Sequence, residues 1–170
     1  MNTSYTRHAG RTDQGFTLLE VLIALLVLSI GLLGIGKLMM LSARANDSAY
    51  MRSQATALAY TILDAMRANR GEALAGSYDI AVGPGPAPVA CTSAAPCSST
   101  AQAQNDLNLW KNALTAALPA GNGSVTTAPV LNASGITQVT AFVTVQWNDT
   151  VAQQVLGGPP AASVVLETIL

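Results

Sequence analysis

The sequence contains little of what most enzymes use for chemistry. It has a single histidine in 170 residues, His8, and only 10% of its residues are charged. Without a histidine after position 8, the rest of the chain has no Ser-His triad and no histidine-based metal site. The acidic residues are scattered, and no phosphate-binding or dinucleotide-binding loop occurs. The sequence therefore predicts a protein that is not an enzyme and needs no cofactor or metal.

Positive charge and aromatic side chains are also scarce. No lysine or arginine follows Lys111, and the formal net charge of the chain is −1. Because phosphate contacts need clustered cations, we expect no nucleic-acid partner. Aromatic residues make up 5% of the chain, which favours a small, loop-rich domain over one with a deep core.

The two cysteines, Cys91 and Cys97, lie in a stretch rich in Pro, Ser and Ala. In an exported chain such a pair indicates a disulfide. A metal site is the weaker interpretation, because two thiols without a histidine make an incomplete ligand set. We therefore predict a Cys91–Cys97 disulfide.

A long apolar run is the most prominent feature that is present. Residues 1–15 are polar, and an apolar block extends from Val21 to Gly36. As a helix, residues 16–36 would be about 31 Å long, which is enough to span a bilayer. Arg7 and Arg11 favour a cytoplasmic amino terminus.

Two ordinary interpretations of this run remain open. A secretory signal would have an apolar core of about 7–15 residues before a small-residue cleavage site. Residues 43–45, Ala-Arg-Ala, match such a site, but the apolar run is too long. A plain single-span anchor fits the hydropathy and leaves Glu20, four residues after Phe16, unexplained.

Residues 15–20, Gly-Phe-Thr-Leu-Leu-Glu, resemble the type IV prepilin signature. The resemblance implies that a prepilin peptidase cuts after Gly15 and methylates the new amine of Phe16. Glu20 then becomes the fifth residue of the mature chain, and the apolar block stays attached. One departure is Gln14, which stands where Lys or Arg is common.

Glu20 needs a partner if it lies in hydrocarbon. A carboxylate at the membrane centre costs on the order of 3 kcal/mol or more. The freed amine of Phe16 is one helical turn away in the same chain. The resemblance implies instead a pair with the amine of a neighbouring subunit, which sets the axial register of a filament. The alternative is that Glu20 extends to the membrane interface.

The helical pattern continues beyond the span, over residues 37–70. Apolar residues recur there at spacings of three and four, which predicts an amphipathic helix with one face toward a head domain. Residues 69–71, Asn-Arg-Gly, provide a stop. Four segments, at 28–34, 46–50, 52–60 and 66–69, resemble the PilV family of type IV pilus modification proteins, which are minor pilins.

The head, residues 71–170, is predicted to hold a small antiparallel sheet. We expect a loop with the disulfide at 71–104, a short helix at 105–118 capped by Asn105 or Asp106, and antiparallel strands within 124–170. The expected strands are 125–131, 139–147 and 163–170. Pro129 marks the first of these as an edge strand. The predicted fold class is α+β: a long helix packed on a small sheet, as in type IV pilins.

The resemblance implies a building block. The expected function is that of a minor pilin that helps to prime type IV pilus assembly, sits near the fibre tip and contributes to twitching motility and adhesion. The implied partners are prepilin peptidase, other minor pilins, the major pilin, inner-membrane assembly machinery and membrane lipid. The expected location is the inner membrane, with the head periplasmic, and then the pilus. The alternatives are a minor pseudopilin of a type II secretion system and a pilin whose head binds a surface ligand or DNA.

Overall fold

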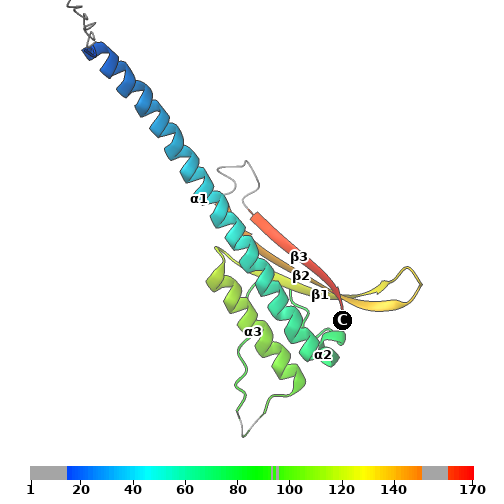
Figure 1. Cartoon of the computed structure of the whole chain (residues 1–170). Coiled ribbons are helices and arrows are strands. Elements are labelled where there is room, and N and C mark those ends of the chain that lie inside the picture. The colour runs from blue at the N-terminus through cyan, green and yellow to red at the C-terminus, as the bar shows by residue number, and fades with distance from the viewer. Residues whose placement is uncertain (1–14, 93, 95, 151–160) are drawn as a thin grey trace, which may run out of the picture. The chain divides into compact units, whose positions relative to one another are not determined.

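The structure, a computed structural model, describes residues 15–92, 94, 96–150 and 161–170. The chain divides into two compact units, residues 1–40 and 41–170. The elements are α1 (Leu18–Ala68), α2 (Arg70–Leu74), α3 (Ser99–Ala117), β1 (Asn122–Leu131), β2 (Thr137–Asn148) and β3 (Ala161–Ile169) (Figure 1). The predicted α+β class, with a long helix and a small antiparallel sheet, is confirmed.

The long helix α1 ends where the sequence predicted a stop, but the chain then turns into a second helix. α1 closes at Ala68 and α2 begins at Arg70, after Asn69. Proline is absent from the 51 residues of α1, so no backbone N–H is missing from its hydrogen-bond ladder. The first unit contains the part of α1 up to Met40, and the second contains the remainder.

The sheet is antiparallel, with the strand order β1-β2-β3. Val143 at its centre pairs with Val125 of β1 and Leu166 of β3. Each strand begins two or three residues earlier than the sequence predicted, because small and polar residues extend the ladders there. β2 also ends one residue later than predicted, and β3 ends one residue earlier. Pro129 lies in β1, at an edge of the sheet, as predicted.

One face of the sheet and the facing sides of α1 and α3 form the core of the second unit. Its members are fully or almost fully buried; among them are Ile62, Leu63, Met66, Tyr78, Leu107, Trp110, Leu114, Leu118, Val125, Val143, Val145 and Trp147. Trp110 donates its indole N–H to the carbonyl of Leu58, at 2.9 Å, which satisfies its one polar atom. A Cβ at Gly123 would lie 2.7 Å from both the Trp110 ring and the Thr144 carbonyl oxygen, so only glycine fits between α3 and the sheet.

Helix α3 begins earlier than predicted, and the predicted caps were wrong. Ser98 is the N-cap, and its hydroxyl accepts from the N–H of Ala101 at 3.2 Å. Asn105 and Asp106 lie inside the helix. Residues 99–104, expected in the loop, belong to the helix; Ala and Gln, which make up most of this segment, are good helix formers.

A buried lysine, Lys111, holds the loop before α3 in place. It was not identified from the sequence. Lys111 is 4% exposed. Its ammonium lies within hydrogen-bond distance of the carbonyls of Ala81 (2.9 Å), Gly83 (3.0 Å) and Gly123 (2.5 Å) and of the side-chain oxygen of Asn122 (3.0 Å). Burial lowers the pKa of Lys111, while the surrounding oxygens favour its charged form. This contact ties the 81–85 loop to α3 and β1.

Candidate assembly site

The residues of the prepilin-like motif lie at the start of α1. Thr17 precedes the helix, and its hydroxyl and carbonyl oxygens accept from the N–H of Glu20 at 3.3 and 3.1 Å. This is the arrangement of an N-cap. Gly15 and Phe16 stand just before the helix, and both are exposed, Phe16 by 83%. The peptide bond between them therefore lies in non-helical, accessible chain, which is the form that a peptidase needs.

The carboxylate of Glu20 has no cationic partner among the described residues. The ion pair that the described residues do form joins Arg67 to Asp64, near the other end of α1. Along α1 the next cation after Glu20 is Lys37, about 25 Å further along the helix axis. Any charge that neutralises Glu20 in an apolar medium therefore has to come from the segment before α1 or from another molecule.

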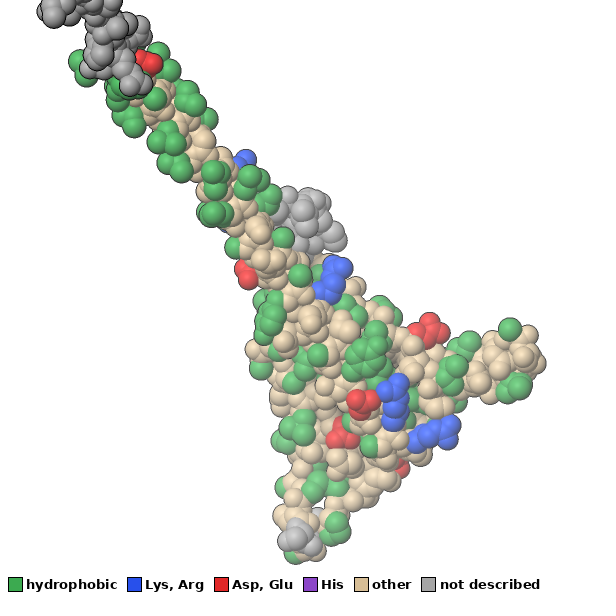
Figure 2. All heavy atoms as spheres, in the orientation of Figure 1, with side chains coloured by type: hydrophobic (Ala, Val, Ile, Leu, Met, Phe, Trp, Pro, Cys, Tyr) green, Lys and Arg blue, Asp and Glu red, His purple; other side chains and the backbone are tan. Residues whose placement is uncertain are grey.

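Apolar side chains surround Glu20 and continue for six turns of helix. Every described residue from 15 to 43 is exposed, and Figure 2 shows hydrophobic side chains along this part of α1. The exposed fractions reach 86% at Leu18 and 75% at Leu33. A surface of this kind is unstable in water and marks contact with lipid or with other helices. Among the described residues, α1 is the one helix long and apolar enough to cross a membrane.

Small residues interrupt the apolar surface halfway along. Apart from the adjacent residues and the backbone of α1 itself, no atom lies within 4 Å of the place where a side chain would begin at Gly31, Gly34 or Gly36. A shallow, open hollow on this part of the helix is lined by Ser29, Leu32, Leu33, Gly36, Lys37 and Met40. Small residues at such positions let a second helix approach closely.

The predicted cysteines belong to the second unit and take no part in this site. The structure joins Cys91 and Cys97 in a disulfide with their Cα atoms 5.2 Å apart. In the described part of the chain, no three His, Cys, Asp or Glu side chains gather where they could hold a metal ion.

The second unit also holds a polar network that sequence reasoning missed. Tyr78, fully buried, donates its hydroxyl to the Asp106 carboxylate at 2.7 Å. Burial and this carboxylate raise the pKa of Tyr78, which stays neutral. The partners are 28 residues apart in sequence, so no local pattern reveals them. The contact fastens the chain after α2 to α3, and its role is structural.

Residues 10–36 match the family model described as the prokaryotic N-terminal methylation motif. No curated protein and no solved structure matches the chain. The motif implies processing by a prepilin peptidase and assembly with other pilins, and with the apolar part of α1 it fits membrane anchoring. Proteins of this kind are structural. The motif and the fold together support placing the chain among type IV pilin-like and pseudopilin proteins.

Proposed function

We propose that the protein is a minor pilin of the PilV type, which helps to prime type IV pilus assembly and enters the fibre near its tip. The observation that carries the proposal is Glu20, a carboxylate on an apolar helix with no cation within reach in the described chain. A charge in that position is costly in lipid, so it marks a site that is completed by assembly.

The partner that we propose for Glu20 is a free amine. Cleavage after Gly15 would create one at Phe16, four residues before the carboxylate. In a bundle of such helices, Glu20 of one subunit would pair with the amine of a neighbour and fix the axial register between them. A subunit that uses its glutamate in this way docks beneath another subunit. From the fibre, the protein would then contribute to twitching motility and adhesion.

The choice of a minor pilin rests on residues 46–69, whose resemblance to the PilV family extends beyond the motif that all prepilin-like proteins share. A minor pseudopilin of a type II secretion system is the second candidate, because the matched motif is common to both. Co-purification of the processed chain with pilus proteins supports the first, and co-purification with secretion proteins supports the second.

Replacing Glu20 by Ala tests the proposal. We expect the Glu20→Ala chain to insert in the membrane and to begin at Phe16, with a methylated amine, by amino-terminal mass spectrometry. Its amount in sheared fibres should fall about tenfold, because a charge pair in an apolar medium is lost. Ser29→Ala is the matched control: this hydroxyl also lies on the apolar part of α1, but it donates to Leu26 of its own helix at 2.7 Å.

Two results would contradict the proposal. One is normal fibre number with normal co-purification of other pilins from Glu20→Ala cells. The other is a wild-type chain whose amino terminus is not Phe16. The Gly15→Ala variant tests cleavage separately from assembly. It should leave the leader attached, while the fold of the second unit is unchanged.

A further inference from the structure

The two edge strands of the sheet, β1 and β3, differ in whether their outward backbone groups are hydrogen-bonded. In β1 the odd-numbered residues direct their backbone groups away from β2. Val125 exchanges two hydrogen bonds with Ile80, at 2.9 and 3.0 Å, and the N–H of Thr127 donates to the Asp79 carboxylate at 2.8 Å. Position 129 is proline, which has no N–H to offer. This edge is therefore closed over three successive outward positions.

At the β3 edge, by contrast, the outward backbone N–H groups have no acceptor within the described ranges. The N–H of Leu170 donates to Val139 of β2, so even-numbered residues of β3 bond to β2 and odd-numbered ones face outward. The outward positions are Ala161, Ser163, Val165, Glu167 and Ile169. Their N–H groups have no backbone or side-chain acceptor within the described ranges. The strand is nine residues long and contains no proline or bulge.

An open, regular edge of this length attracts another extended chain, and proteins usually block it. Two of its outward residues are large and apolar, with Val165 exposed by 59% and Ile169 by 58%. Within the described ranges, β3 has neither of the features that close β1, a pairing segment or a proline, and Glu167 is its one charged outward residue. We propose that β3 receives an extended strand from another subunit, which continues the sheet.

An antiparallel second copy of this chain does not fit as the source of the strand. Ser48 of α1 donates to Asp149 at 2.5 Å, and Arg67 donates to Thr168 at 3.4 Å. Asp149 adjoins Asn148, which pairs with the first residue of β3, so this part of α1 and β3 run in the same direction. Two copies joined through antiparallel β3 strands would therefore direct the Leu41 ends of their helices oppositely. One membrane cannot anchor both.

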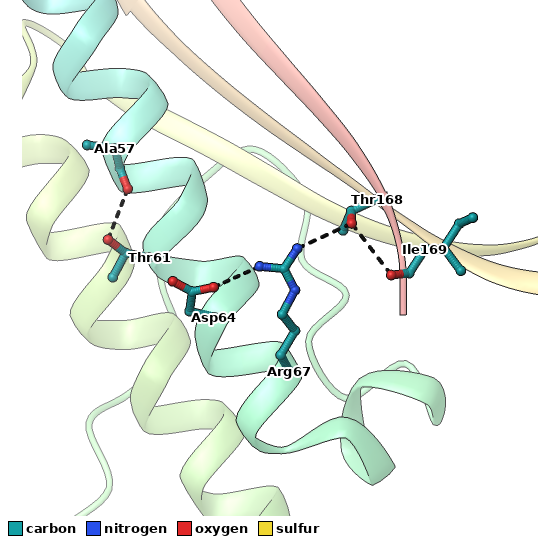
Figure 3. Close-up of polar contacts among 6 residues, drawn as sticks. All are labelled: Ala57, Thr61, Asp64, Arg67, Thr168 and Ile169. Carbon is teal, nitrogen blue, oxygen red and sulfur yellow. Dashed lines mark hydrogen bonds and ion pairs between the residues drawn. The ribbon is translucent and has the colours of Figure 1, made fainter.

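Charge defines the partner further. Figure 3 shows Arg67 reaching from α1 to Asp64 and to Thr168 of β3. The Arg67 side chain is 49% exposed, and the exposed Arg70 donates to the Leu170 carbonyl at 2.9 Å. Arg67 is already paired with Asp64, so Arg70 is the cation at the end of β3 that has no ion-pair partner among the described residues. The incoming strand therefore carries a carboxylate that reaches Arg70, and β-branched side chains suit its extended conformation. That the strand belongs to another pilin-like subunit rests on the proposed function.

Proline at an outward position tests the proposal with little cost to the fold. Val165→Pro removes one outward N–H and no bond to β2, and Pro129 shows that the opposite edge accommodates proline at such a position. Val165→Thr is the matched control, because it changes the side chain and keeps the N–H. Ser163→Pro is a second variant of the same design, and thermal unfolding of each full-length chain in detergent verifies folding.

The readout is photo-crosslinking in cells that make the full chain and its assembly partners. A photoreactive residue at Glu167 should crosslink to one extended segment of a different pilin-like chain, identified by mass spectrometry of the joined peptides. The same residue at Thr126 on β1 should not. Val165→Pro should reduce the crosslinked fraction about tenfold, as expected when one or two hydrogen bonds are lost. Val165→Thr should leave it unchanged.

Three outcomes overturn the proposal: no crosslink, a crosslink to a second copy of this chain, or a crosslink that both proline variants retain. The amino-terminal mass of the same sample distinguishes a failure of strand addition at β3 from a failure of the proposed assembly function. A processed chain beginning at Phe16 without a β3 crosslink contradicts strand addition and leaves the assembly function standing. An unprocessed chain that crosslinks nothing contradicts both.

Discussion

At the scale of single residues, the Glu72 carboxylate shows how the polar head is held together. It accepts from the hydroxyls of Ser77 at 2.5 Å and Ser99 at 2.8 Å, and so joins α2 to the first turn of α3. These hydrogen bonds to the charged form lower the pKa of Glu72 below its ordinary value of 4.5. The unfolded chain therefore binds more protons than the folded one as the pH falls past that value.

Glu72→Gln should for this reason destabilise the protein in a pH-dependent way. The stabilisation by Glu72 is present above pH 4.5 and is lost as the pH falls through the lower pKa of the folded state. The melting temperature of the variant should lie below that of the wild type at about pH 7, and the difference should shrink at about pH 3. Glu167→Gln, which removes one exposed carboxylate, is the control. A difference that is independent of pH would contradict this account.

Residues that act within one short segment could be recognised from sequence alone, and residues that act across the fold could not. Gly15, Phe16 and Glu20 belong to one contiguous motif, so their spacing along the chain is meaningful by itself. Lys111 meets Ala81 and Gly123 only after the loop, α3 and β1 have packed together. Nothing near Lys111 in sequence distinguishes it from a solvated lysine.

At the scale of elements, the start of α3 provides a direct test of local structure. Ser98→Ala removes the N-cap hydroxyl and should cost about 1 kcal/mol, which corresponds to a fall of about 2–4 °C in melting temperature for a chain of this size. Gln104→Ala, at an exposed position inside the same helix, is the control. Circular dichroism during heating measures both. An equal or larger loss in Asn105→Ala than in Ser98→Ala would show that the helix begins later.

The strands were easier to predict than the condition of their edges. Alternation of apolar residues identified β2, and Pro129 marked β1 as an edge strand. The closure of that edge depends on Asp79 and Ile80, which come more than 40 residues earlier in the chain. The open edge of β3 is likewise a property of the assembled sheet, since an outward N–H is defined only by the register with β2.

At the scale of the whole molecule, the two units differ in whether their apolar side chains are buried or exposed. Every buried apolar residue that forms the core lies between Ala55 and Trp147, within the second unit. The apolar residues of the first unit are exposed, from Leu18 to Met40. The first unit therefore needs lipid or other helices, whereas the second has a core of its own and one internal disulfide, Cys91–Cys97.

It follows that residues 41–170 should fold without the residues that precede them. Expressed in an oxidising compartment, so that the Cys91–Cys97 bond forms, this fragment should be soluble and monomeric by size-exclusion chromatography. It should unfold cooperatively, within about 3 °C of the full chain in detergent, because a core buried in one unit contributes equally to both. A fragment that aggregates, or binds a hydrophobic dye without a cooperative transition, would mean that the first unit stabilises the head and that the core of the second unit is incomplete by itself.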